Sequence, residues 1–293
     1  MRVLILGAAG MLGHKLCQML SARFDTFATL RGLPRDLARY GLIEPARLLG
    51  GVDAADFDSI VRAVAQVGPA AVINCIGIIK QLPTAKDPIV SIAANSLLPH
   101  RLGNLCRAVG ARLVHISTDC VFSGRKGMYC EDDPADAEDL YGRSKLLGEV
   151  AGPGCLTLRT SIIGRELCTQ SGLVEWFLGN RGGRVRGFTR AIYTGLTTRA
   201  LAEVISTVLE RHPQLEGLWQ VSSEPIDKCA LLRLINEAYG AEVEIVADDQ
   251  FACDRSLDST RFRRAIGWQP PAWPAMIADL RSDPTPYDEW RTQ

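Results

Sequence analysis

A tyrosine and a lysine stand four residues apart in the segment Y-G-R-S-K, at Tyr141 and Lys145. On a helix this spacing puts both side chains on one face and within mutual reach. A free phenol has a pKa of about 10, and a neighbouring ammonium stabilises the phenolate and brings the phenol nearer to the working pH. The pair can therefore serve as a proton donor, although the same spacing also occurs by chance as surface decoration of helices.

A glycine-rich turn, G-A-A-G-M-L-G at 7–13, directly follows the first apolar stretch of the chain. In this context the first glycine permits a tight turn, the second lets the backbone approach a pyrophosphate, and the third allows close packing of helix on strand. A purely structural turn is the alternative, because the spacing is G-x-x-G-x-x-G. We predict that the following residues of the turn bind a dinucleotide: Gly7, Gly10, Met11, Leu12 and Gly13.

The end of the second expected strand carries Arg31 where NAD enzymes usually place an acid for the ribose hydroxyls. An arginine can pair with a 2′-phosphate, so NADPH/NADP is favoured over NAD; a solvated surface arginine is the alternative. Asp53 would accept a hydrogen bond from the adenine amine if it ends the third strand, and is otherwise a loop aspartate. Residues beside the cofactor track at the end of the fourth strand are Asn74, Cys75, Ile76 and Gly77.

Hydroxyl side chains end another apolar strand, at Ser117 and Thr118. There a hydroxyl would face the same cofactor and hydrogen-bond a substrate carbonyl. The glycine turn, these hydroxyls and the Tyr141–Lys145 pair are each weak signals, but together they make coincidence a poor explanation.

The elements that must position these residues alternate along the chain in a β-α-β rhythm. This rhythm predicts an α/β fold: a Rossmann-type doubly wound parallel sheet with a smaller C-terminal α/β substrate lobe. We assign 1–160 to an NADP-binding domain with a returning segment near 190–222, and 161–189 and 223–293 to the substrate lobe. From Pro270 onward the chain is expected to have little regular structure. The expected strands are 3–6, 24–30, 71–74, 112–117, 155–159, 217–221 and 243–246, and the expected helices 11–20, 95–109, 141–150, 199–211 and 231–239.

Composition excludes several other classes of protein. The 33 basic and 33 acidic residues cancel, so no global field would attract nucleic acid or anionic lipid. No stretch approaches the roughly 18 apolar residues that a membrane span needs. Nine cysteines without a C-x-x-C pair suit unpaired thiols in the cytoplasm, and the four histidines (His14, His100, His115 and His212) suggest no metal site.

With these motifs in view, the chain resembles the extended short-chain dehydrogenase/reductase superfamily and, within it, the dTDP-4-dehydrorhamnose reductases. The resemblance spans nearly the whole chain and rests on the glycine turn, V-I-N at 72–74, S-T-D-C-V-F-S-G at 117–124, Y-G-R-S-K-L-L-G-E at 141–149 and L-R-T-S at 158–161. Residues 257–261 and 266–268 also resemble the C-terminal signature of nucleotide-sugar enzymes.

This resemblance implies NADPH-dependent reduction of the C4 keto group of a nucleotide-linked 4-keto-6-deoxy sugar, in the synthesis of deoxysugar and polysaccharide precursors. It implies Thr118, Tyr141 and Lys145 as the catalytic triad, with Ser117 and Asn74 on the nicotinamide side and Asn95 as a supporting residue. The partner would be the nucleotide sugar, without nucleic acid or membrane, and a homodimer is compatible with it.

Substrate contacts are expected around the same motifs and in a basic stretch, 181–190, that is our candidate for the substrate diphosphate; a solvated basic loop is its alternative. The residues expected to contact substrate are Thr118, Val121, Phe122, Ile163, Arg184 and Arg186. Cys120 replaces a usual tyrosine, and residues 161–164 lack the expected tryptophan and tyrosine, so the sugar and the base stay open between dTDP- and UDP-linked compounds. The segment 78–81 is left without a role.

Two other classes of function share this scaffold. One is an epimerase or dehydratase with tightly held NAD; a dehydratase normally needs an acidic pair after the threonine, whereas Thr118 is followed by Asp119 and Cys120. The other is a non-catalytic binding protein like the regulatory subunit of methionine adenosyltransferase, which the sequence also resembles. The retained Tyr141 and Lys145 favour an enzyme.

Overall fold

Residues 1–291 are described in the computed structural model, and they form two compact units. The first comprises 1–117, 138–158 and 202–218, and the second 118–137, 159–201 and 219 onward. We expected the first domain to comprise 1–160 with a returning segment near 190–222; the returning segment of the first unit is 202–218, and 118–137 belongs to the second unit. No local signal in the sequence marks 118–137 as part of the second unit.

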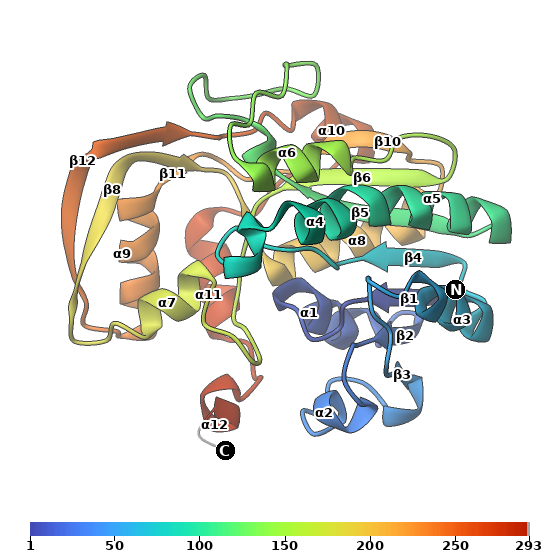
Figure 1. Cartoon of the computed structure of the whole chain (residues 1–293). Coiled ribbons are helices and arrows are strands. Elements are labelled where there is room, and N and C mark those ends of the chain that lie inside the picture. Colours follow the sequence, from blue (N-terminus) through green and yellow to red (C-terminus); the bar gives the residue numbers. More distant parts are fainter. Residues whose placement is uncertain (292–293) are drawn as a thin grey trace. The chain divides into compact units, whose positions relative to one another are not determined.

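A seven-stranded sheet forms the centre of the first unit, in the order β10-β6-β5-β4-β1-β2-β3 (Figure 1). The pairs β1–β2, β1–β4, β2–β3 and β4–β5 are parallel, as the predicted Rossmann-type α/β architecture requires. Its strands are β1 (Arg2–Leu6), β2 (Asp25–Thr29), β3 (Leu48–Leu49), β4 (Ala71–Asn74), β5 (Arg112–Thr118), β6 (Cys155–Thr160) and β10 (Gly217–Gln220). The predicted fold class is confirmed.

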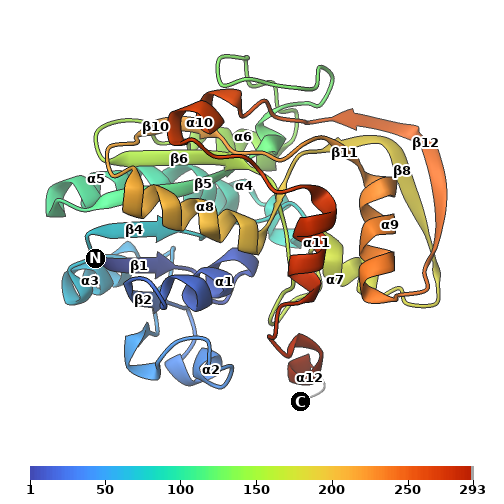
Figure 2. The same cartoon turned by 180° about the vertical axis from the view of Figure 1, so that it is seen from behind.

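Helices cover both faces of this sheet. On one face lie α3 (Phe57–Val67) and α5 (Leu98–Val109), and α8 (Thr198–Arg211) lies on the face seen in Figure 2. Helix α3 buries Ile60, Ala63, Val64 and Val67, the i, i+3, i+4, i+7 spacing of one helical face. It ends at Gly68, which adopts a left-handed conformation.

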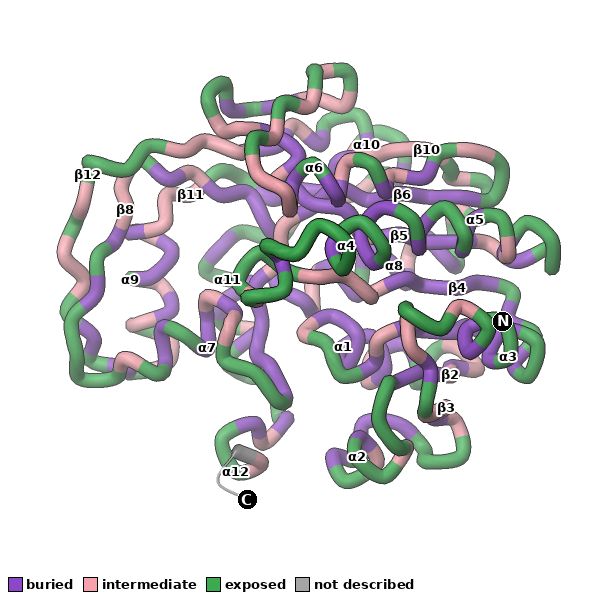
Figure 3. The backbone as a smooth tube through the Cα atoms, in the orientation of Figure 1, coloured by how far each residue is buried: buried purple, intermediate pink, exposed green. Residues whose placement is uncertain are grey.

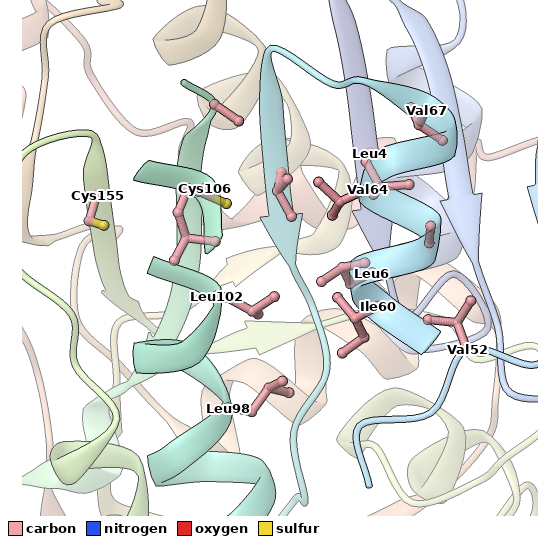
Figure 4. Packing of buried hydrophobic residues seen from close by; sticks show 14 of the residues in the cluster. Leu4, Leu6, Val52, Ile60, Val64, Val67, Leu98, Leu102, Cys106 and Cys155 are labelled. Carbon is pink, nitrogen blue, oxygen red and sulfur yellow. The ribbon is translucent and has the colours of Figure 1, made fainter. Parts of the chain in front are cut away.

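Aliphatic side chains of β1, α3 and α5 meet in the main core of this unit (Figure 4). Leu4 and Leu6 of β1 face Ile60 and Val64 of α3, and Leu102 of α5 belongs to the same cluster. In Figure 3 the strands β1, β4 and β6 are buried along most of their length, while the outer turns of α5 are exposed. This core fixes the carboxyl ends of the strands, where the predicted site residues lie.

The remaining elements of the first unit connect these layers. They are α1 (Met11–Leu20), α2 (Pro34–Ala38), η1 (Pro45–Arg47), η2 (Pro83–Lys86), α4 (Pro88–Ser91), the π-helix η3 (Ile92–Leu97) and α6 (Leu140–Leu147). A π-helical segment is rare and is frequently found at functional sites.

The second unit contains a three-stranded sheet in the order β11-β8-β12. Strand β8 (Arg184–Tyr193) runs parallel to β12 (Glu244–Asp254) and antiparallel to β11 (Ile226–Asp227). Helix α9 (Lys228–Tyr239) packs on this sheet and α11 (Trp273–Arg281) on α9. Its other elements are η4 (Asp119–Val121), β7 (Ile162–Ile163), α7 (Leu173–Leu178), β9 (Leu196–Thr197), α10 (Thr260–Ile266) and α12 (Tyr287–Arg291).

One expectation for this unit and one alternative are wrong. The basic stretch, for which a solvated loop was the alternative to a diphosphate site, pairs with β12 as a strand from Arg184 onward. The Pro-rich end is not irregular, because α11 and α12 form there. Pro274 is the second residue of α11, where a helix does not need the missing N–H, and Trp273, Met276, Ile277 and Leu280 are buried by this helix.

Candidate active site

The glycine turn has the backbone geometry that its motif predicts. Gly7 adopts a φ of 88°, which favours glycine. A methyl group on Gly13 would lie 2.1 Å from the Gly7 carbonyl oxygen, so α1 can approach β1 this closely only with glycine there. Helix α1 begins at Met11 and has no acidic residue in its first turn.

This turn fits the pyrophosphate of a dinucleotide. The first N–H groups of a helix, here including those of Met11 and Leu12, have no acceptor within the helix and carry the positive end of its dipole. The absence of an acid in this turn leaves that positive potential uncompensated. The glycine turn is thus a suitable cradle for an anion.

The side chains expected to recognise the adenosine end lie beyond β2 and β3. Arg31 is exposed and, among residues 1–291, forms no ion pair or hydrogen bond through its side chain. Its guanidinium is free to bind a phosphate. Asp53 does not end the third strand, because β3 stops at Leu49. Its carboxylate accepts a hydrogen bond from the Ala55 N–H at 2.9 Å. The adenine contact was predicted only for an aspartate that ends the third strand, and Asp53 is the loop aspartate of the alternative.

The end of β4 is held rigidly beside the glycine turn. The Asn74 amide contacts His115 Nδ1 at 3.1 Å and accepts a hydrogen bond from the Ile76 N–H. Burial raises the pKa of the Cys75 thiol to about 12, so this thiol is protonated at neutral pH. Gly77 lies close to the side chains of Asn95 and Lys145. A methyl group on Gly77 would lie 3.2 Å from Asn95 Oδ1 and 4.0 Å from Lys145 Nζ.

Helix α6 presents the predicted proton donor and its lysine. It begins after Asp139, whose carboxylate accepts a hydrogen bond from the Gly142 N–H at 2.8 Å and caps the helix. Tyr141 is in the first turn and is partly exposed, while Lys145 is buried one turn later. The predicted arrangement of this pair on one helix is therefore present.

Lys145 carries a charge in a buried position. Its ammonium donates a hydrogen bond to the Ile116 carbonyl oxygen at 2.7 Å. Burial lowers the pKa of Lys145 to about 8, although the charge of Glu149 opposes this shift. Such a perturbed pKa beside the ends of β4 and β5 is typical of a functional position.

Asn95 ties the unassigned segment 78–81 to α6. Its side-chain oxygen accepts a hydrogen bond from the Ile78 N–H at 2.8 Å, and its amide donates to the Ile78 carbonyl at 3.1 Å and to Ser144 Oγ at 3.2 Å. Lys80 then pairs with Asp139 at 2.6 Å. The segment is thus anchored to the helix that carries Tyr141.

Two polar residues in this unit were not predicted. Asp139 immediately precedes a helical pattern, which is a capping signal visible in the sequence. Glu149 accepts a hydrogen bond from Ser117 Oγ at 2.7 Å and lies four residues after Lys145, a spacing that could have indicated it. Ser117, expected beside the nicotinamide, therefore also has a protein partner.

In the second unit, Thr118 and Asp119 begin a buried polar cluster. Thr118 Oγ1 donates to Asp119 Oδ1 at 3.1 Å and accepts from the Cys120 N–H at 3.1 Å. Burial raises the pKa of Asp119, while Arg255 and Lys228 lower it. Asp119 and Lys228 were not predicted, because 108 intervening residues separate them in the chain and no local pattern links them.

Three predicted substrate contacts belong instead to packing. Val121 and Phe122 have no exposed surface, and Ile163 is also buried. The Phe122 ring stacks on the Tyr129 ring, with centroids 4.1 Å apart. The Arg159 guanidinium lies over the Phe122 ring, 5.2 Å from its centroid. These side chains support the turn after β5 rather than offer a surface to a ligand.

Arg184 and Arg186 lie two residues apart on β8, and both are exposed. Arg184 pairs with Glu244 at 3.4 Å, and Arg186 pairs with Asp248, in each case across the β8–β12 ladder. Cross-strand ion pairs of this kind account for both residues structurally. Their predicted contact with a diphosphate would require these pairs to open.

In residues 1–291, no three His, Cys, Asp or Glu side chains are grouped so that they could hold a metal ion. None of the helices described is both long and apolar enough to cross a bilayer.

Comparison with models of protein families shows to which family the chain belongs. The family described as RmlD substrate binding domain matches residues 1–281. The chain belongs to this family. One relative from Streptomyces antibioticus is 31% identical over 74% of this chain and 70% of its own length. It is named as a probable dTDP-4,6-dihydroxy-2-methyloxan-3-one 4-ketoreductase.

Other members of the family match shorter parts. A dTDP-4-dehydrorhamnose reductase from Streptomyces griseus is 36% identical over 51% of this chain and 44% of its own length. One from Mycolicibacterium smegmatis is 32% identical over 56% of this chain and 46% of its own length. The chain thus spans about half the length of these relatives.

Solved structures of two enzyme types share the fold. A dTDP-4-dehydrorhamnose reductase from Bacillus anthracis, in complex with NADP, has a TM-score of 0.78 at 20% identity and covers 95% of this chain and 98% of its own. A UDP-glucose 4-epimerase from Thermotoga maritima has a TM-score of 0.80 at 14% identity and covers 100% of both chains. At these identities the likeness establishes the fold alone.

Proposed function

We propose that this chain uses NADPH to reduce the C4 keto group of a nucleotide-linked 4-keto-6-deoxy sugar. The observation that carries the proposal is the buried Lys145 ammonium on the same helix as Tyr141, in a unit that also has the glycine cradle. Relatives in the family are named as reductases of such sugars, and one solved structure of the same fold contains NADP. The exposed, unpaired Arg31 favours the 2′-phosphate form.

When bound, NADPH supplies a hydride that is added to the carbonyl carbon. Tyr141 then donates its phenolic proton to the developing alkoxide, so that one hydride and one proton convert the ketone to an alcohol. The Lys145 charge stabilises the phenolate that remains, and Thr118 donates a hydrogen bond to the same substrate oxygen. For this the Thr118 hydroxyl must turn away from Asp119, its acceptor in the structure.

The test is NADPH oxidation, followed by absorbance, with dTDP- and UDP-linked 4-keto-6-deoxy sugars as substrates. Wild type and Tyr141→Phe are compared, since phenylalanine keeps the ring and removes the proton. We expect turnover with at least one sugar, and a loss of about 100-fold or more in kcat for the variant. The affinity for NADPH should stay within about twofold.

Other results would point to the rival functions. No oxidation with either nucleotide, despite tight NADPH binding, would favour a non-catalytic binding protein. Release of bound NAD on denaturing the purified protein, with interconversion of sugar epimers, would favour an epimerase. Unchanged kcat in Tyr141→Phe would remove the tyrosine from the mechanism.

A further inference from the structure

A lysine in the second unit has an environment that its structural role does not explain. Lys228 is the first residue of α9 and is partly exposed. Its ammonium lies 3.9 Å from the centroid of the Tyr193 ring. In the part of the chain that the structure describes, it forms no hydrogen bond and no ion pair within 4 Å.

This position is unfavourable for a cation in two respects. The start of a helix carries the positive end of the dipole, which repels an ammonium. Burial also disfavours its charge and lowers the pKa of Lys228 to about 8. The contact with the Tyr193 ring offsets only part of these costs and leaves the N–H donors of the ammonium without an acceptor.

The surroundings define which ligand would suit these donors. The charged and titratable groups that act on Lys228 are Asp119, Cys120 and Cys253. The Asp119 carboxylate would repel an anionic ligand such as a diphosphate, but not a neutral oxygen. Asp119 also directly follows Thr118, which the proposed function assigns to the substrate.

Tyr193 is itself held in place, so the lysine has a defined platform. Its ring contacts Trp273 with centroids 5.6 Å apart. A methyl group on Gly195 would lie 2.0 Å from Tyr193 Oη, so this ring position requires glycine two residues later. The Asp227 carboxylate caps α9 by accepting a hydrogen bond from the Ala230 N–H at 2.8 Å.

We propose that Lys228 determines sugar specificity by donating hydrogen bonds to a neutral oxygen on the sugar ring, a hydroxyl or the carbonyl of an N-acyl group. This inference rests on the proposed function and adds the residue that reads the sugar. Lys228 also interacts electrostatically with Cys120, the position at which the resemblance led us to expect a tyrosine.

The experiment measures binding rather than turnover. With NADP present, calorimetry gives the affinities of wild type, Lys228→Met and Lys228→Arg for dTDP-L-rhamnose, dTDP, UDP-N-acetylglucosamine and UDP. Methionine keeps most of the length and loses the donors. Lys86→Met, at an exposed lysine without a side-chain partner among the described residues, is the matched control.

We expect Lys228→Met to weaken binding of a sugar nucleotide about tenfold or more, with dTDP and UDP changed less than twofold and Lys228→Arg between the two. NADP affinity should be unchanged, which shows that the variant is folded. Equal losses for the sugar nucleotide and the free nucleotide would assign Lys228 to the diphosphate and overturn the inference. So would unchanged binding in the variant. Failure of wild type to bind either sugar nucleotide would instead refute the proposed function, and this inference with it.

Discussion

At the scale of single residues, the buried charge of Lys145 opposes the stability of the fold. Because burial lowers its pKa to about 8, the unfolded chain binds more protons than the folded chain between about pH 8 and the normal lysine pKa. The free energy of unfolding therefore gains a contribution that rises with pH through this window. Below it, the buried charge costs the folded state on the order of 3 kcal/mol.

Lys145→Met should separate the proposed catalytic role of this residue from its effect on stability. We expect loss of reductase activity but a protein about 2 kcal/mol more stable at pH 7, after allowance for about 1 kcal/mol from the lost hydrogen bond to the Ile116 carbonyl. The difference from wild type should shrink as the pH rises from 8 to 10. Urea unfolding at several pH values measures it. A variant less stable than wild type at pH 7 would contradict this account.

Arg31 should decide between the two forms of the cofactor. Since its side chain has no partner in the described chain, Arg31→Ala removes no internal contact. We expect the affinity for NADPH to fall about tenfold or more while that for NADH changes little, because only NADPH has the 2′-phosphate. Fluorescence titration measures both. Arg62→Ala, at an exposed arginine of α3, is the control, and equal losses for both cofactors would refute the assignment.

At the scale of elements, the position of α6 depends on its contact with the π-helix η3. A methyl group on Gly148 would lie 1.8 Å from the Asn95 carbonyl oxygen, so only glycine lets the end of α6 approach η3 this closely. Ser96 Oγ reinforces the contact by donating to the Ser144 carbonyl at 2.7 Å. Both contacts lie on the helix that carries Tyr141.

Gly148→Ala should therefore displace α6. We expect kcat to fall by about tenfold or more and the free energy of unfolding to fall by about 1–3 kcal/mol, as for overpacked sites. Gly179→Ala is the matched control, because a methyl group there meets its nearest atoms at 3.4 and 3.5 Å and φ is −68°. Full activity in Gly148→Ala would show that α6 tolerates the shift.

Local signals in the sequence predicted much of this element structure. The glycine turn and the strands β1, β2, β4, β5 and β6 follow from spacing and apolar runs, which depend on neighbouring residues; the two-residue strand β3 was not predicted. The contacts of Lys80 with Asp139 and of Lys228 with Tyr193 do not, because these residues meet only after folding. The helix α11 was missed because Pro274 was interpreted as a breaker, whereas at the second helical position it is tolerated.

At the scale of the whole molecule, the residues that the proposals use are distributed over two compact units. The glycine turn and Lys145 belong to the first, whereas Asp119, Tyr193 and Lys228 belong to the second. The chain passes between the units several times, so neither is a continuous segment. Hydrogen exchange measured peptide by peptide reports the local stability of each segment, so it can show in which unit a substitution lowers stability.

The buried ion pair of the second unit offers such a test. Arg165 Nε donates to Glu175 Oε1 at 2.7 Å, both side chains are nearly inaccessible, and Arg165 also pairs with Asp288 of α12. Glu175→Gln removes the buried negative charge and leaves the guanidinium undercompensated. We expect a loss of about 3 kcal/mol in the free energy of unfolding.

The loss should appear first in the second unit, as faster hydrogen exchange in α7 and α12, while exchange in α1 and β1 stays unchanged. Glu203→Gln, in an exposed pair with Arg23 at 3.0 Å, is the control and should cost less than about 1 kcal/mol. If Glu175→Gln cost no more than this control, Asp288 alone would compensate Arg165. Faster exchange in α1 at the same time would instead mean that the two units unfold together.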